Sequence, residues 1–186
     1  YVRGLSLVDA GRLSEAAQPM HQFYAIWSHD KSISSPLAFG HCDAGYAMAL
    51  GGRTEEGVAI LKAASAFPQC MAYLADVQDH QGRRPLADET FQQAIQLAPD
   101  VPFAYQEWGL ALLRRGDVKG AGQMFDLAHV HGPAWADPLK GIGDVQAARR
   151  QWGDARHSYE AAAKLAPAGQ AVRQAQERAA AAARGN

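Results

Sequence analysis

Apolar residues recur along this chain at helical spacing, in paired segments separated by a glycine. Trp108 and Leu112 lie on one face of a first helix, and Ala121 and Phe125 lie on one face of a second. Gly116 stands between the two segments, where a turn is expected. The pattern therefore predicts helix-turn-helix units rather than strands.

These units repeat with a fixed period. Three prolines lie 34 residues apart and close successive units: Pro99, Pro133 and Pro167. A proline has no amide hydrogen and cannot continue a helix, so each is expected to end a second helix. A glycine stands 17 residues before each of the first two prolines, and Arg150 takes that place before the third. The same small and aromatic residues follow at equal offsets: Ala87, Phe91 and Ala94; Ala121, Phe125 and Ala128; Ala155, Tyr159 and Ala162.

This order of residues over about 34 positions resembles the tetratricopeptide repeat (TPR) family. The best single copy reads Tyr105, Trp108, Gly109, Leu112, Gly116, Ala121, Phe125, Ala128 and Pro133. The resemblance implies an all-α fold, a right-handed α-solenoid of helix-turn-helix repeats with a C-terminal capping helix. We expect one solenoid domain over residues 1–186, its first helix beginning before Tyr1. The expected units are 1–30, 38–67, 68–101, 102–135 and 136–169, with an insertion at 31–37 and the capping helix at 170–184.

Small residues are expected where the two helices of a unit cross. Gly109 and Ala121 hold these places in the best copy, and Gly57 replaces the alanine in an earlier unit. A larger side chain there would force the helices apart at a cost of about 1–3 kcal/mol.

The resemblance also implies a concave groove, lined by the first helix of each unit, in which a partner segment binds. The groove residues expected from the register are Phe39, Tyr46, Tyr73, Asp76, Asp79, His80, Phe103, Glu107, Arg114, Lys140 and Asp144. Tyr46, Tyr73 and Phe103 are the expected apolar anchors, since aromatic residues are frequent among binding hot spots. The acidic residues are expected to select a basic or amide-rich ligand, and the alternative is that they only solvate the surface. TPR domains that bind the C-terminal carboxylate of chaperones share a set of lysines, arginines and asparagines in this groove. Here Asp76, Leu110 and Asp144 stand where the resemblance calls for asparagine or arginine, so binding of chaperone tails is not expected.

We therefore interpret the chain as a non-enzymatic scaffold or adaptor with a protein or peptide partner. One alternative is a regulatory or assembly segment of a larger enzyme or bacterial envelope complex, acting through its convex face or through Phe23, Tyr24 and Trp27. Another is self-association through an exposed end. The abundance of alanine and the preference for arginine over lysine favour a bacterial source.

Charge and residue spacing argue against several other classes. The net charge is −1 and the sequence has no basic cluster, so a nucleic-acid partner is not expected. The sequence also has no run of about 18 apolar residues, so a membrane span is not expected either. His129 and His131 are two residues apart and do not share a helix face, and His41, Cys42 and Asp43 are consecutive. We therefore expect no catalytic residue, no metal site and no cofactor.

The only two cysteines are Cys42 and Cys70. Two free, partly buried thiols are expected, and a bridge between them is the alternative. Two cellular locations are compatible with the sequence, namely the cytoplasm, or the periplasm if an upstream signal has been removed.

The sequence contains the adhesion tripeptide Arg-Gly-Asp, formed by Arg115, Gly116 and Asp117. Their place between two predicted helices indicates a turn instead, with the glycine ending the first helix.

Overall fold

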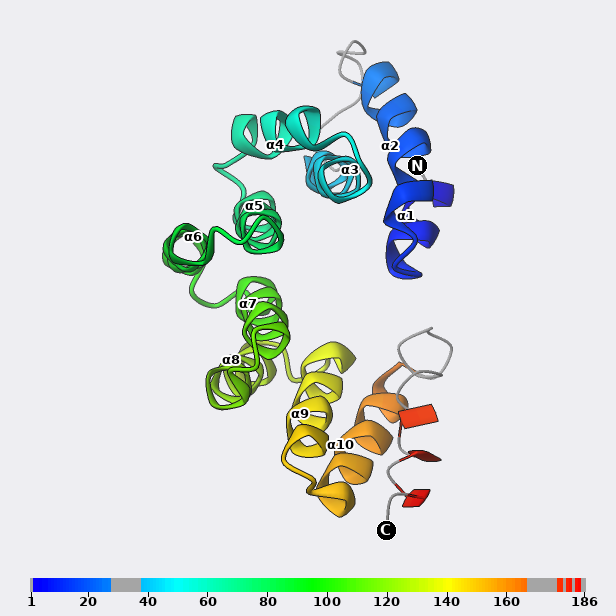
Figure 1. Ribbon diagram of the computed structural model, residues 1–186, viewed down its shortest axis with the longest axis vertical. Coiled ribbons are helices and arrows are strands. Elements are labelled where there is room, and N and C mark those ends of the chain that lie inside the picture. The colour runs from blue at the N-terminus through cyan, green and yellow to red at the C-terminus, as the bar shows by residue number, and fades with distance from the viewer. Residues whose placement is uncertain (1, 28–37, 167–176, 179, 182, 185–186) are drawn as a thin grey trace. The chain divides into compact units, whose positions relative to one another are not determined.

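The computed structural model describes residues 2–27, 38–166, 177–178, 180–181 and 183–184. Ten α-helices run through the first two of these ranges (Figure 1). They are α1 (Val2–Asp9), α2 (Leu13–Trp27), α3 (Ala38–Leu50), α4 (Thr54–Ala63), α5 (Pro68–His80), α6 (Arg84–Leu97), α7 (Pro102–Arg114), α8 (Val118–His131), α9 (Ala136–Ala148) and α10 (Trp152–Leu165). The expected insertion and most of the expected capping helix lie outside the described residues.

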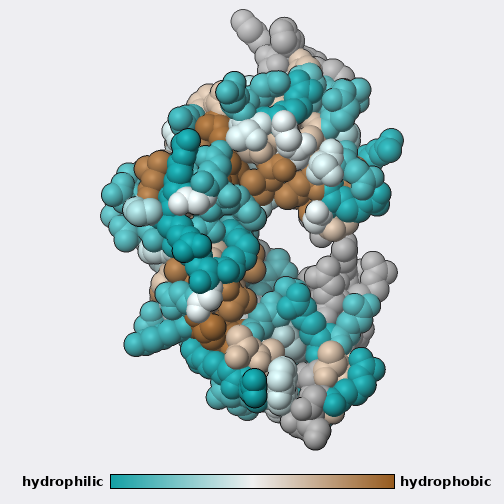
Figure 2. Space-filling view, viewed as in Figure 1, coloured by the Kyte–Doolittle hydropathy of each residue, from teal (hydrophilic) through white to brown (hydrophobic). Residues whose placement is uncertain are grey.

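The helices gather into two compact units, residues 1–98 and 99–186. That the chain forms a single domain stays a prediction. Within each unit, consecutive helices pack as pairs. Most of the face seen in Figure 2 is hydrophilic, and hydrophobic patches interrupt it. The second helices α6 and α8 end at Leu97 and His131, two residues before Pro99 and Pro133, as the prolines predicted.

The first unit holds α1 to α6, and α3 packs against α2, α4 and α5. Ala16 and Met20 of α2 are fully buried against α3, and Phe23 and Tyr24 pack onto this cluster. Tyr24 also meets the ring of His41 edge-on, with centroids 5.3 Å apart. Both aromatic residues are therefore half-buried packing residues, while the side chain of Trp27 lies outside the description.

Gly57 lies where α3 and α4 touch through their backbones. A Cβ at this position would lie 2.3 Å from the amide nitrogen of Ala49 and 2.4 Å from the carbonyl oxygen of Gly45. Even the alanine usual at this place in the repeat would not fit, which explains why glycine replaces it here.

The second unit is centred on Phe125 of α8, which is fully buried. A Cβ on Gly109 of α7 would lie 2.7 Å from its ring, and a Cβ on Gly141 of α9 would lie 2.5 Å from it. The ring therefore packs directly on the backbones of two successive first helices, as the predicted column of small residues requires.

Gly116 and Arg150 hold equivalent turn positions in the second unit. Gly116 has φ +83°, and Asp117 follows it as the N-cap of α8, accepting a hydrogen bond from the amide of Gly120 at 2.9 Å. The adhesion tripeptide is thus a helix-capping turn, as predicted. Arg150 has φ 60° and adopts the left-handed conformation without being a glycine.

Arg150→Gly is expected to raise the free energy of unfolding by about 0.5–1 kcal/mol, because the relieved backbone strain exceeds the entropy that glycine adds to the unfolded chain. Urea unfolding followed by circular dichroism measures the change. Gln151→Gly is the matched control, since Gln151 has an ordinary φ of −85° and should lose stability instead. Equal losses in both variants would contradict the strain at Arg150.

Candidate functional site

Cys42 of α3 and Cys70 of α5 form a disulfide, with Cα atoms 4.5 Å apart. The prediction of two free thiols is therefore wrong. Both residues are fully buried in one apolar cluster, and α3 and α5 lie side by side (Figure 1). The stacking of successive first helices brings together two cysteines that are 28 residues apart in the sequence.

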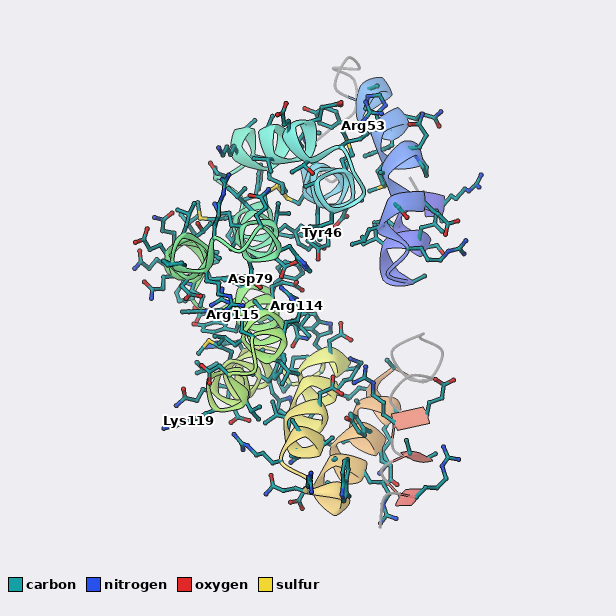
Figure 3. All side chains as sticks on the ribbon, viewed as in Figure 1. Tyr46, Arg53, Asp79, Arg114, Arg115 and Lys119 are labelled. Atoms are coloured by element: carbon teal, nitrogen blue, oxygen red, sulfur yellow. A yellow bond between two sulfur atoms is a disulfide. The ribbon has the colours of Figure 1, made fainter. Side chains whose placement is uncertain are left out.

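Tyr46 of α3 and Tyr73 of α5 pack on this same cluster. Their rings stack with centroids 4.2 Å apart, and Tyr46 projects from α3 beside α5 (Figure 3). Tyr46 donates a hydrogen bond to Asp76 Oδ2 at 2.8 Å, and Tyr73 donates one to Asp43 Oδ1 at 3.3 Å. Each helix thus supplies one tyrosine and one aspartate, and the two pairs cross between the helices.

These contacts engage the carboxylates of Asp43 and Asp76. Asp76 is fully buried, and His80 Nε2 lies 3.5 Å from its Oδ2. Asp43 also accepts a hydrogen bond from Gln69 at 3.2 Å. The prediction that Asp76 selects a ligand assumed an exposed carboxylate, whereas its side chain is engaged within the unit.

In the second unit, Asp144 of α9 lies at the centre of a polar cluster. Its Oδ1 accepts hydrogen bonds from the hydroxyl of Tyr159 at 2.8 Å and from the guanidinium of Arg178. Its Oδ2 lies 3.3 Å from Lys140 Nζ. The Asp144 side chain is only 8% exposed, so its charge is balanced inside the unit.

Burial and the adjacent Asp144 carboxylate raise the pKa of the Tyr159 phenol above its ordinary value of about 10. In the unfolded chain Tyr159 ionises near pH 10, whereas in the folded chain it stays neutral. The unfolded state is therefore favoured increasingly above pH 10, and the stability that this group contributes is lost as the pH rises.

Tyr159→Phe is expected to be less stable than the unchanged chain at pH 9, and this difference should shrink towards pH 11. Urea unfolding at a series of pH values measures both curves. Parallel curves across this range would contradict the raised pKa.

A pocket of about 520 Å³ opens beside this cluster. Its lining comes from α7, α9, α10 and the C-terminal segment: Leu110, Leu113, Arg114, Asp144, Ala147, Ala148, Tyr159 and Arg178. Arg114 stands at the C-terminal end of α7 (Figure 3). The pocket thus combines an apolar floor with two guanidinium groups and one engaged carboxylate.

The remaining predicted groove residues lie elsewhere. Phe103 of α7 stacks on Trp135 with centroids 6.3 Å apart, and Glu107 is half-buried on α7. Asp79 is half-buried on α5. Phe39 lies on α3, but its side chain is outside the description.

Sequence reasoning missed the roles of three residues in these clusters, namely Asp43, Tyr159 and Arg178. Arg178 follows Asp144 by 34 residues, which is one full repeat. The period of the chain could therefore have indicated this pair.

Within the described ranges, no three His, Cys, Asp or Glu side chains gather in a way that could hold a metal ion. The helices of these same ranges include none that combines the length and apolarity of a membrane span.

No protein-family model matches the chain, and no curated protein sequence does so either. Solved structures do match it. YrrB, a TPR protein with an unusual peptide-binding site, is 18% identical with a TM-score of 0.56, covering 94% of this chain and 88% of YrrB. Cut9 in the APC/C complex Cut9–Hcn1 is 16% identical with a TM-score of 0.62, covering 92% of this chain and 34% of that one.

A third match is the first TPR domain of Spaghetti (RPAP3) bound to the HSP90 peptide SRMEEVD. It is 18% identical with a TM-score of 0.54, covering 64% of this chain and 95% of that one. At these identities the comparisons establish the fold: the chain has the TPR fold, an all-α solenoid of helical repeats. The predicted fold class is confirmed.

Proposed function

We propose that this chain, which has the TPR fold, is a non-enzymatic scaffold or adaptor that binds a partner protein segment against its first helices. The observation that carries the proposal is the pocket of the second unit, which two successive first helices, α7 and α9, line with Leu110, Leu113 and Ala147. Apolar pockets with a few placed polar groups are typical ligand sites. The peptide in the RPAP3 structure and the peptide-binding site of YrrB support a peptide partner.

The chemistry of the pocket favours binding over reaction. Its lining offers apolar side chains and guanidinium groups, and the carboxylate of Asp144 already has three polar contacts. Its two oxygens already contact Tyr159, Lys140 and Arg178, so little of this carboxylate is open to a substrate.

Affinity capture with the full chain tests the proposal. Leu113→Glu places a charge on the pocket floor and should abolish retention of the partner. Leu127→Glu is the matched control, because Leu127 lies on α8, is 38% exposed and does not line the pocket. Loss of retention with Leu127→Glu but not with Leu113→Glu would overturn the proposal and favour binding through the second helices.

The buried disulfide supports the periplasmic alternative for the compartment, since structural disulfides persist in oxidising environments. Thiol labelling of denatured protein from its native source, without reductant, is expected to modify neither Cys42 nor Cys70. Quantitative labelling of both would place the chain in a reducing compartment.

A further inference from the structure

The two cysteine sulfurs of the first unit are closed off from solvent. Cys42 of α3 and Cys70 of α5 are both fully buried. The apolar cluster around them draws residues from three helices, among them Ala49 of α3, Leu61 of α4 and Val77 of α5. Thiol–disulfide exchange begins when a thiolate approaches one sulfur of the bond, so its rate depends on access to that sulfur. Neither cysteine offers this access in the folded unit.

Movement of a single side chain does not expose the bond. Tyr46 stacks on Tyr73 across the same two helices, and hydrogen bonds to Asp76 and Asp43 run from one helix to the other. Exposing a sulfur therefore requires α3 and α5 to part, which breaks these contacts and opens the apolar cluster. Such an opening unfolds the core of the first unit, which is a rare event under native conditions.

The same closure applies to the reaction that makes the bond. Oxidation passes through a mixed disulfide, in which one cysteine is bonded to a sulfur of the oxidant. Protein interiors have few voids larger than a water molecule. A fully buried Cys42 or Cys70 therefore has no space for such an adduct while its neighbours stay packed.

From these observations we infer that an oxidant with a reactive disulfide forms the bond on the unfolded chain, before α3 and α5 stack, and that opening of the first unit controls access to the bond afterwards. The thiolate of one cysteine attacks the oxidant's disulfide and releases one oxidant thiolate. The thiolate of the other cysteine then attacks the mixed disulfide and releases the second. Two electrons pass from the cysteines to the oxidant, and the two thiol protons end on the oxidant's sulfurs.

The partner of this step is a thiol oxidase that accepts an unfolded segment. Cys42 and Cys70 are the only cysteines of the chain, so one intramolecular pairing exists and no isomerisation step is required. They are 28 residues apart, and a flexible loop of this length closes in about a microsecond or less. The pair therefore meets readily before folding. This step concerns how the chain matures and is independent of the proposed function.

Reduction of the full oxidised chain by dithiothreitol tests whether the folded unit shields the bond. Samples are quenched at intervals with a maleimide that adds mass to each free thiol, and oxidised glutathione corrects for any effect of urea on the exchange itself. In buffer, reduction is expected to be at least about 100-fold slower than in urea that unfolds the chain, because only the rarely open unit reacts. Similar corrected rates in both solutions would overturn the inference.

Two valines at equivalent places in the repeat locate the opening event. Val77 of α5 and Val145 of α9 lie two repeats apart in the sequence and are 1% and 3% exposed. Val77→Ala loosens the first unit and is expected to speed reduction at least about fivefold. Val145→Ala is the matched control in the second unit and should change the rate by less than about twofold. Equal acceleration by both variants would contradict control by the first unit.

The order of oxidation and folding is tested from the reduced side. The chain is reduced in urea and diluted into buffer, circular dichroism follows its helices, and glutathione disulfide is then added. A chain that has regained its full helical signal with free thiols should be oxidised at least about 30-fold more slowly than in urea. A chain that regains this signal only as its thiols are lost supports the same order. Oxidation of a fully helical chain at the rate seen in urea would overturn the inference.

Discussion

Phe125→Ala is expected to lower the free energy of unfolding of the second unit by about 3–5 kcal/mol. Phe125 is fully buried, and its ring packs on the backbones of α7 and α9 at Gly109 and Gly141. Neither glycine carries a side chain that could move into the space left by the ring, so the cavity would remain largely open. Urea unfolding followed by circular dichroism measures the loss.

Leu127→Ala is the matched control for this prediction. Leu127 lies on the same helix but is 38% exposed, so its truncation should cost less than about 1 kcal/mol. Similar losses for both variants would show that Phe125 is not the centre of packing in this unit.

Reduction of the disulfide between Cys42 and Cys70 is expected to lower the free energy of unfolding of the first unit by about 3–4 kcal/mol. The bond closes a loop between residues that are 28 apart in the sequence, and the chain-entropy model gives this magnitude for such a loop. Thermal or urea unfolding with and without reductant measures the effect.

The double variant Cys42→Ala, Cys70→Ala provides the control. It should unfold at the same denaturant concentration with and without reductant, near that of the reduced chain. An unchanged chain that is equally insensitive to reductant would contradict a disulfide in the folded protein.

The repeat pattern predicted most of the fold because its signals are local. Pro99 and Pro133 correctly predicted where the second helices α6 and α8 end, and the glycine column marked the turns. Arg150 interrupts that column, yet its backbone still adopts the left-handed conformation, because the helices on either side dictate the turn.

Contacts between successive helices could be predicted less well. The sequence register places Cys42 and Cys70 on neighbouring helices, but it does not tell which side chains meet when those helices stack. Hydrophilicity likewise marked Asp76 and Asp144 as surface charges, although both are buried beside tyrosine hydroxyls. The burial of a charge depends on partners from other helices, and a single sequence does not show these partners.

The most direct test of the account is photo-crosslinking from two positions in cells of the native source. A photoreactive amino acid at position 113 reports on the first helices, and the same amino acid at position 127 reports on the second helices. We predict that position 113 crosslinks to a partner protein and that position 127 does not. Crosslinking from position 127 alone would contradict the claim that this chain binds its partner along its first helices.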